Sequence, residues 1–110
     1  MILIKRGEVW WVDFDPSIGG EIQKTRPALV ISNDFANETS NRVQVIPLTN
    51  NIKKCYPCEA YVTINNKKSK AMADQIMTVS KKRLKSKLGI ISDNEMHLVE
   101  KAIKIQLLLK

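Results

Sequence analysis

The alternation of hydrophobic and polar positions along the chain predicts several short β-strands followed by one long helix. Five segments have the β-branched, aromatic or alternating composition of strands, namely residues 8–14, 28–32, 43–48, 59–64 and 71–79. The second and third of these are short continuous apolar runs, which is typical of strands covered on both faces. The first is bounded by Gly7 and Pro16, both of which interrupt regular structure.

The segments between these strands carry turn chemistry. Residues 15–24 form a polar loop with two glycines, and residues 33–41 are rich in the Asn, Asp and Ser typical of turns. Residues 65–68 predict a hairpin turn. Ser80 can cap a short basic turn over residues 81–88.

The C-terminal segment predicts an amphipathic helix. Ser92 with Glu95 three residues later matches a capping box, which marks a helix start. Its wide apolar stripe consists of Met96, Leu98, Val99, Ala102, Ile103, Ile105, Leu107 and Leu109. A stripe this wide indicates burial against the sheet and against something else, such as a second subunit. The chain therefore predicts one domain over residues 1–110: a small, strongly bent antiparallel sheet or open barrel with a C-terminal helix.

Composition and charge narrow the class of protein. Hydrophobic residues make up 44% of the chain and charged residues 26%, which is ordinary for a globular protein. No stretch reaches the roughly 18 apolar residues of a membrane helix, so we expect a cytoplasmic protein with no membrane association. The net charge is +7, with several lysine runs beyond residue 50. This excess favours a polyanionic partner, although each run is also compatible with a solvated surface.

Arg26 is the first candidate for chemistry. It stands directly before Pro27 at the start of an apolar run. The proline ring disfavours helical dihedral angles at the preceding residue, so the backbone of Arg26 should be extended and its direction fixed. A guanidinium is a permanently charged fork that matches a phosphate group with two hydrogen bonds. Arg26 is therefore either a phosphate ligand or the surface end of a strand.

The two cysteines and the single histidine do not form a convincing site. Cys55 and Cys58 are spaced as a CxxC pair, but a redox pair needs a helix N-terminus after a strand, and this pair precedes a predicted strand. With one histidine and no second pair, a zinc site lacks ligands. Catalysis by two imidazoles is excluded, and His97 has a structural or exposed role. We expect no metal and no cofactor.

Four polar residues, Arg26, Thr49, Glu21 and Gln75, lie at the ends of apolar runs or between them. A strand scaffold can direct such side chains into one groove. Singly, each has an ordinary explanation: Thr49 can simply end a strand, and Gln75 can satisfy backbone groups.

Several segments, in the same order, resemble the MazF/PemK/Kid family of toxin endoribonucleases. The matching segments are residues 7–16, 19–21, 26–32, 45–49, 56–57 and 73–76, together with the closing helix. The resemblance implies a small SH3-like or CcdB-like barrel, a homodimer, and metal-independent cleavage of single-stranded RNA at short sequences. It also implies a cognate antitoxin whose C-terminal segment occupies the RNA groove.

Carried over by position, Arg26 and Thr49 match the catalytic Arg and Thr of the family. Positions that contact RNA or shape its groove are matched by Gly20, Glu21, Lys24, Asn33 and Gln75. Some relatives have a histidine directly before the catalytic arginine, where this chain has Thr25.

The implied mechanism can be argued physically. RNA supplies its own nucleophile, the 2′-OH, so the protein has to align it and stabilise charge on the phosphorus. Arg26 and Thr49 would donate to the non-bridging oxygens, leaving a 2′,3′-cyclic phosphate and a 5′-OH. A guanidinium stays protonated near neutral pH and is a poor base, so Glu21 is an alternative base. Two other functions stay open: a CcdB-like toxin that poisons gyrase by contact, and a plain nucleic-acid-binding module.

Overall fold

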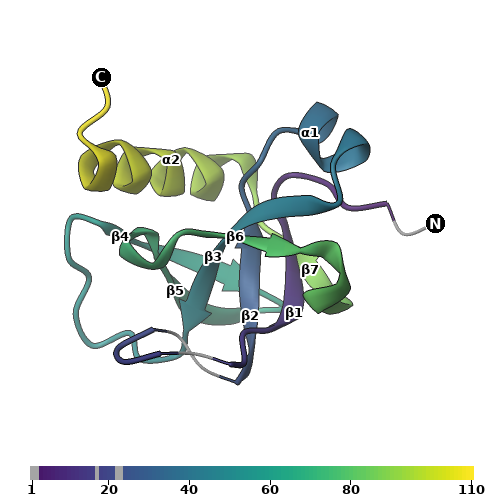
Figure 1. Ribbon diagram of the computed structural model, residues 1–110. Coiled ribbons are helices and arrows are strands. Elements are labelled where there is room, and N and C mark those ends of the chain that lie inside the picture. The colour runs from purple at the N-terminus through teal and green to yellow at the C-terminus, as the bar shows by residue number, and fades with distance from the viewer. Residues whose placement is uncertain (1–2, 17, 22–23) are drawn as a thin grey trace.

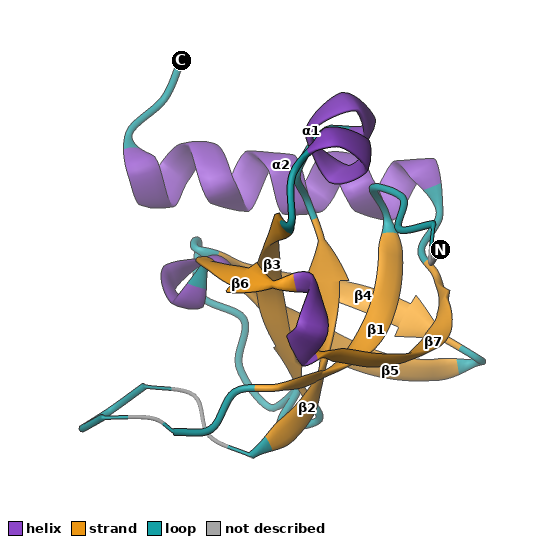
Figure 2. Ribbon diagram, turned by 45° about the vertical axis from the view of Figure 1, so that its right-hand side comes forward, coloured by secondary structure: helices purple, strands orange, loops and turns teal. Residues whose placement is uncertain are grey.

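An antiparallel sheet curled into a half-barrel, with a long helix across one side, forms the described part of the chain (Figures 1 and 2). The computed structural model describes residues 3–16, 18–21 and 24–110. The strands are β1 (Glu8–Asp13), β2 (Thr25–Val30), β3 (Arg42–Thr49), β4 (Glu59–Ile64), β5 (Lys67–Met72), β6 (Met77–Ser80) and β7 (Leu84–Ile90). The helices are α1 (Asp34–Thr39) and α2 (Asp93–Leu107), with short 3₁₀ turns η1 (Ala73–Gln75) and η2 (Lys81–Arg83).

The central strand of this sheet is β3, which pairs with three neighbours. It pairs along one side with β2 through residues 45–47. Along the other side it pairs first with β6, through residues 42–45, and then with β5, through residues 48–49. The full order is β4-β5-β3-β2-β1-β7, with β6 beside the first half of β3. The change of partner divides the sheet into two parts that curl around a shared core.

Two apolar clusters fill the faces of the sheet. One contains Val9, Leu29 and Ile46 and continues into β4, β5 and the underside of α2. The other lies on the opposite face and contains Trp10 and Val45. Neighbouring residues of one strand thus enter different clusters, as the two-residue repeat of a strand requires. The continuous apolar runs predicted as doubly covered strands are confirmed.

The helix α2 begins where its capping residues predict. The Ser92 hydroxyl accepts a hydrogen bond from the Glu95 amide at 3.2 Å. The Glu95 carboxylate does not return to Ser92; it accepts from the Thr63 amide of β4 at 2.9 Å and so joins the helix to the sheet. Only half of the predicted capping box forms, because the sheet edge offers Glu95 a backbone donor.

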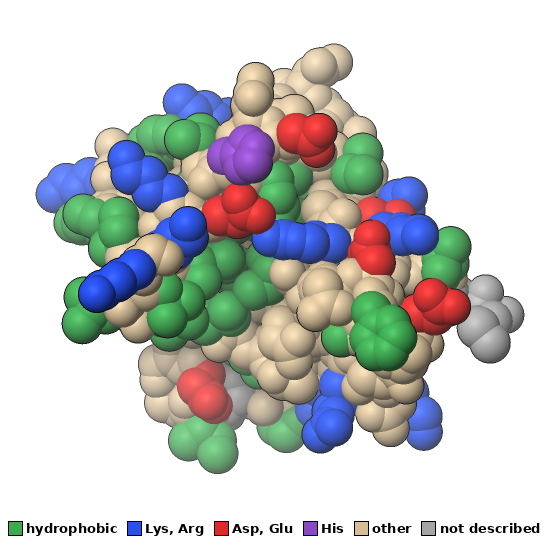
Figure 3. Space-filling view, turned by 90° about the horizontal axis from the view of Figure 1, so that it is seen from above, with side chains coloured by type: hydrophobic (Ala, Val, Ile, Leu, Met, Phe, Trp, Pro, Cys, Tyr) green, Lys and Arg blue, Asp and Glu red, His purple; other side chains and the backbone are tan. Residues whose placement is uncertain are grey.

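The apolar stripe of α2 is divided between the core and the surface. Val99 and Ala102 are buried against the sheet. Four other residues of the stripe are exposed: Leu98, Ile105, Leu107 and Leu109. Figure 3 looks down on this side of the molecule and shows apolar side chains among basic ones. Among the described residues, no helix is long and apolar enough to span a membrane.

Three predicted elements differ from the observed ones. Residues 33–41 were expected to form turns only but contain α1, because the Asn33 side chain caps its N-terminus. The segment 81–88 contains the edge strand β7 after a turn capped by Ser80. Its exposed lysines made it resemble a turn, although charged side chains are usual on edge strands. The strand expected over 71–79 is interrupted by η1 and forms parts of β5 and β6.

Glu8 is a buried carboxylate that joins β1 to β7. Its Oε1 accepts from the Lys5 amide at 2.9 Å and from Trp10 Nε1 at 3.0 Å, and its Oε2 lies 2.8 Å from Lys87 Nζ. Burial raises the pKa of Glu8, but the hydrogen bonds from Lys87, Lys5 and Trp10 outweigh burial. The pKa is therefore lowered from its ordinary value of 4.5.

We expect Glu8→Gln to lower the free energy of unfolding at neutral pH by about 1–2 kcal/mol, because it removes the charged acceptor of Lys87. A lowered pKa in the folded state stabilises the wild type above about pH 4.5, and this contribution disappears as the pH falls through the folded-state pKa. Urea unfolding across this range should show the stability difference narrowing on acidification. A difference that stays constant with pH would contradict this account.

Candidate functional site

A pocket of about 370 Å³ opens where β2 begins and β3 ends. Because β2 and β3 are antiparallel, these two ends lie at the same edge of the sheet. The pocket is lined by Trp11, Arg26, Pro27, Leu48, Thr49, Asn50, Ile64, Asn65, Lys67, Ser69 and Leu88. We call it the Arg26–Thr49 pocket, because it brings together these two candidate residues, which are 23 positions apart in the sequence.

Arg26 is half-buried on β2, where it pairs with Val12 of β1. On the other side, β2 pairs with β3 through Ala28–Pro47, Leu29–Ile46 and Val30–Val45. Continuing this register two residues beyond Ala28–Pro47 sets Arg26 opposite Thr49. Residues directly opposite in an antiparallel pair project from the same face of the sheet. Strand pairing therefore accounts for the convergence of Arg26 and Thr49.

The Thr49 hydroxyl is oriented by its own chain. It accepts a hydrogen bond from the Asn51 amide at 3.2 Å, and a hydroxyl that accepts a hydrogen bond retains its proton as a donor. Directly opposite Thr49 on β5 lies Lys70. The buried Lys70 Nζ is 3.0 Å from Glu59 Oε1 and donates to the Lys54 carbonyl at 2.8 Å. This ammonium group holds the segment that leaves Thr49.

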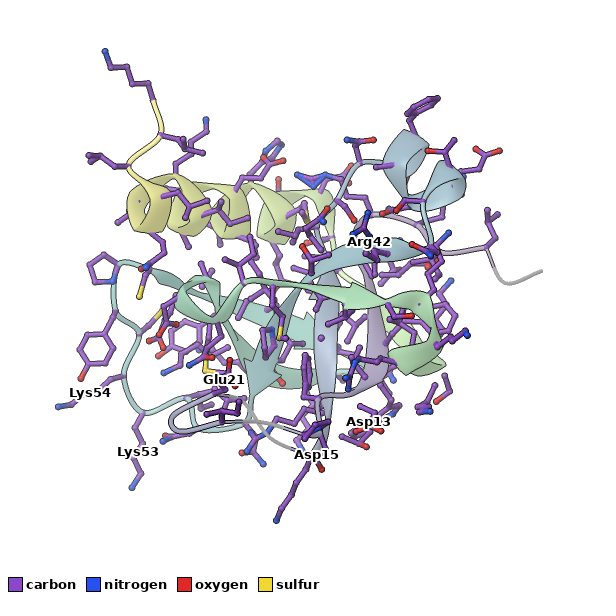
Figure 4. The ribbon with its side chains drawn as sticks, viewed as in Figure 1. Asp13, Asp15, Glu21, Arg42, Lys53 and Lys54 are labelled. Atoms are coloured by element: carbon purple, nitrogen blue, oxygen red, sulfur yellow. The ribbon has the colours of Figure 1, made fainter. Side chains whose placement is uncertain are left out.

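The loop between β1 and β2 is fixed at its base. The Phe14 amide donates to the Lys24 carbonyl, and the Lys24 amide donates to Asp15 Oδ1, both at 2.9 Å. Arg83 reaches across from η2 and donates to the carbonyl oxygens of Asp13, at 3.0 Å, and Asp15. The lower edge of the molecule in Figure 4 carries Asp13, Asp15 and Glu21. Arg42 lies higher in that view, at the start of β3, and Thr49 is at the other end of this strand.

Glu21 and Gln75 lie in a different groove from Arg26 and Thr49. This second groove, the Glu21–Gln75 groove, has a volume of about 460 Å³ between the loop after β1 and the segment η1–β6. Glu21 Oε1 accepts from the Ile18 amide at 2.7 Å, so the carboxylate closes a turn of its own loop. The structure thus does not gather the four predicted polar residues into one groove.

The other predicted RNA contacts are dispersed. Gly20 and Lys24 are exposed in the loop between β1 and β2. Asn33 lies beyond the opposite end of β2 from Arg26, and its Oδ1 accepts from the Ala36 amide at 2.8 Å. The structure therefore gives Asn33 the role of a helix cap and places it away from the Arg26–Thr49 pocket.

The two cysteines and the histidine do not line the Arg26–Thr49 pocket. Cys55 is exposed, Cys58 is half-buried, and both are free thiols in the loop before β4. Burial raises the pKa of Cys58, and the charges of Asp74 and Glu59 act in the same direction, which disfavours the thiolate form. His97 is exposed, with Nδ1 3.1 Å from Glu100 Oε1. Within the described residues, no three His, Cys, Asp or Glu side chains form a metal-binding group.

The pocket also contains residues that sequence reasoning did not select, chiefly Trp11, Asn65 and Lys67. A signal for Trp11 was present. Two adjacent tryptophans in one strand must project from opposite faces, so Trp10 and Trp11 cannot share one environment. Asn65 and Lys67 arrive from the β4–β5 hairpin, whose position beside Arg26 depends on the pairing of β5 with β3.

Comparison with known proteins places this geometry in a family. The model of PemK-like, MazF-like toxins of type II toxin–antitoxin systems matches residues 5–107. Endoribonuclease MazF9 of Mycobacterium tuberculosis (strain ATCC 25618 / H37Rv) is 37% identical over 114 aligned residues, which cover 96% of this chain and 97% of that protein.

Solved structures agree on the fold. The form I crystal structure of MazF from Deinococcus radiodurans has a TM-score of 0.88 at 23% identity, covering 99% of this chain and 100% of that one. An endoribonuclease from a mycobacterial species, in complex with its cognate antitoxin, has a TM-score of 0.82 at 23% identity and 97% coverage of both chains. The predicted small antiparallel barrel with a C-terminal helix is thus confirmed. The chain belongs to the family of PemK-like, MazF-like toxins of type II toxin–antitoxin systems.

Proposed function

We propose that this protein is the toxin of a type II toxin–antitoxin system and acts as a sequence-specific, metal-independent endoribonuclease on single-stranded RNA. The observation that carries the proposal is the convergence of Arg26 and Thr49 on one pocket, from the ends of two paired strands. The name of the Mycobacterium tuberculosis relative, an endoribonuclease at 37% identity over nearly the whole chain, supports the same activity.

In the proposed reaction the 2′-OH of the RNA attacks the adjacent phosphorus and the 5′-oxygen leaves. The products are a 2′,3′-cyclic phosphate and a 5′-OH. Arg26 donates two hydrogen bonds to the non-bridging oxygens, on which negative charge grows in the transition state. Thr49 donates a third from its hydroxyl, which the Asn51 amide orients. Both residues stand on strands, so little reorganisation is needed when the phosphate arrives.

The position of Glu21 decides whether its carboxylate can accept the 2′-OH proton. This carboxylate lies in the Glu21–Gln75 groove and accepts from the Ile18 amide. Glu21 acts as the base only if the loop between β1 and β2 carries it to the Arg26–Thr49 pocket. Gly20, Lys24 and Gln75 would then contact RNA on either side of the cut. Asn33 caps α1 beyond the other end of β2, so it is not part of this proposed contact set.

We also propose the partners. A cognate antitoxin would place an acidic C-terminal segment in the RNA groove, since a chain with net charge +7 attracts both polyanions. The mycobacterial structure in complex with its cognate antitoxin supports such a partner. A homodimer in which α2 contributes to the interface would cover the exposed Leu98 and Ile105. We place this one-domain toxin of residues 1–110 in the cytoplasm, where its RNA substrate is found.

A single 2′-deoxy substitution at the cleaved nucleotide should abolish the cut, because it removes the nucleophile. The affinity for the oligonucleotide should change little, because the phosphate contacts remain. The measurement compares product formation and binding for matched oligonucleotides in excess EDTA. Cleavage of the deoxy substrate, or a requirement for an added metal ion, would contradict the proposed chemistry. Binding with no cleavage of either oligonucleotide would favour a binding module or a contact poison.

Arg26→Ala should reduce kcat/KM by about 10³-fold or more, because a bidentate donor to the reacting phosphate is lost. Arg42→Ala provides a matched control. Arg42 is an exposed arginine at the start of β3, at the end of the strand away from Thr49. Each variant loses one arginine, so the net charge of the protein changes equally in both. Thermal unfolding should show that both variants fold. Equal activity losses in the two variants would mean that charge, and not the position of Arg26, matters.

Thr49→Val should lower kcat by about 100-fold with a smaller effect on KM, since the hydroxyl is assigned to the transition state. Thr49→Ser keeps the hydroxyl and should retain most of the activity. Single-turnover kinetics separate the two parameters. If Thr49→Val raises KM and leaves kcat intact, Thr49 binds the substrate without stabilising the transition state.

A further inference from the structure

The Arg26–Thr49 pocket contains more than a phosphodiester group needs. Its polar rim includes Arg26, Thr49 and Lys67, which suit a phosphate. Three further polar residues, Asn50, Asn65 and Ser69, also line it. Its apolar lining is formed by Trp11, Pro27, Leu48, Ile64 and Leu88. A volume of about 370 Å³ lies within the range of small-ligand pockets, roughly 300–1,000 Å³. An apolar wall beside a phosphate ligand is suited to a flat, uncharged group attached to that phosphate.

Trp11 is the aromatic residue of this wall, and its environment differs sharply from that of Trp10. Trp10 is 6% exposed, belongs to the core, and donates from Nε1 to Glu8. Trp11 is 37% exposed and lines the pocket. It is paired with Pro27, the residue that follows Arg26. The indole is therefore held on a strand, in the same pocket as the proposed phosphate ligand Arg26, and is accessible to solvent.

The pairing of β1 with β7 is irregular around the two tryptophans. The register shifts between Val9 and Trp10, and again between Trp11 and Val12. Irregularities of this kind redirect side chains and occur frequently beside active sites. The hairpin residues Ile64, Asn65 and Lys67 line the same pocket as Trp11. We call the part of the pocket lined by Trp11 and this hairpin the slot.

We infer that Trp11 is a stacking platform for a nucleobase adjacent to the cleaved phosphate, so that the slot between Trp11 and the β4–β5 hairpin is a base-binding subsite. This inference rests on the proposed RNA-cleaving function and extends it to substrate recognition. Aromatic side chains bind single-stranded nucleic acids by stacking on bases, while basic side chains hold the backbone. Here Trp11 has the first role, and Arg26 and Lys67 have the second.

The test uses short oligodeoxyribonucleotides, which lack the 2′-OH and report binding without cleavage. Homopolymers of deoxyadenosine, deoxycytidine and thymidine are compared, at one low salt concentration, with an abasic oligomer of the same length and charge. Intrinsic fluorescence is informative because the two tryptophans occupy different environments. Bases should quench the wild-type signal, whereas Trp11→Phe, which retains only the buried Trp10, should show little quenching.

Trp11→Ala should weaken binding of at least one homopolymer by roughly 10- to 100-fold. It should leave the affinity for the abasic oligomer unchanged, and Trp11→Phe should restore most of the affinity. This pattern isolates stacking from folding and from charge. An equal loss for the abasic oligomer, or no loss for any homopolymer, would overturn the inference.

The result is separable from the test of cleavage. Base-dependent quenching by Trp11 in a protein that leaves RNA intact would support the subsite while contradicting the nuclease. Normal RNA cleavage by a Trp11→Ala variant with unchanged affinity for every homopolymer would leave the nuclease standing and remove the subsite.

Discussion

The site depends on how β3 distributes its backbone hydrogen bonds. Gln44 directs both its carbonyl and its amide toward the β2 side, where they bond the Ile31 amide and the Ser32 hydroxyl. Successive residues of a strand point their backbone N–H and C=O groups to opposite sides. Gln44 and Ile46 therefore face β2, whereas Val45 and Pro47 face the other neighbour. Pro47 therefore turns its nitrogen away from β2, toward the gap between the last pair with β6 and the first pair with β5. A missing N–H is tolerated there, because no partner strand needs it.

This arrangement explains how a small sheet can present a rigid site. At the Pro47 gap β3 leaves β6 and joins β5, and the same strand then delivers Thr49 to the pocket. Arg26 is fixed on β2 by the shared register. A slip of one residue between β2 and β3 would turn one of the two side chains to the other face, and it would also expose core residues such as Ile46. The burial of the core therefore enforces the alignment of the proposed catalytic pair.

Most of the strands could be predicted from the sequence. The separation of the Arg26–Thr49 pocket from the Glu21–Gln75 groove could not. The strand around Ala28 could be predicted from its continuous apolar run, and the helix after Ser92 from its capping residue and long apolar stripe. The six-residue α1 is too short to show helical periodicity, and Asn33 suits a turn and a helix cap equally well. The exposed lysines of β7 disguised an edge strand.

The residues of the site also divide into those that could be placed from the sequence and those that could not. Arg26 and Thr49 could be paired because the family resemblance singles them out, and both also stand at the ends of predicted strands. Glu21 could not be placed from the sequence, because its position depends on a glycine-bearing loop that folds back on the Ile18 amide. Gln75 is the last residue of η1, whose turn redirects the chain after β5. Trp11 can be recognised as a pocket residue only when the alternation of side chains along β1 is combined with the position of the β4–β5 hairpin.

Charge and shape have different tasks in this protein. Several cations are engaged in structural pairs, Lys70 with Glu59, Lys87 with Glu8, and Arg6 with Glu100. The net charge of +7 nevertheless attracts any polyanion, and such attraction weakens with salt and carries no sequence information. In the proposed nuclease, discrimination between RNA sequences would therefore arise where bases meet the protein, in the pocket and groove beside the loop after β1. An acidic antitoxin segment would use the same long-range attraction as RNA. The antitoxin segment and the RNA would then compete for one surface, although only the RNA would make the contacts that recognise bases.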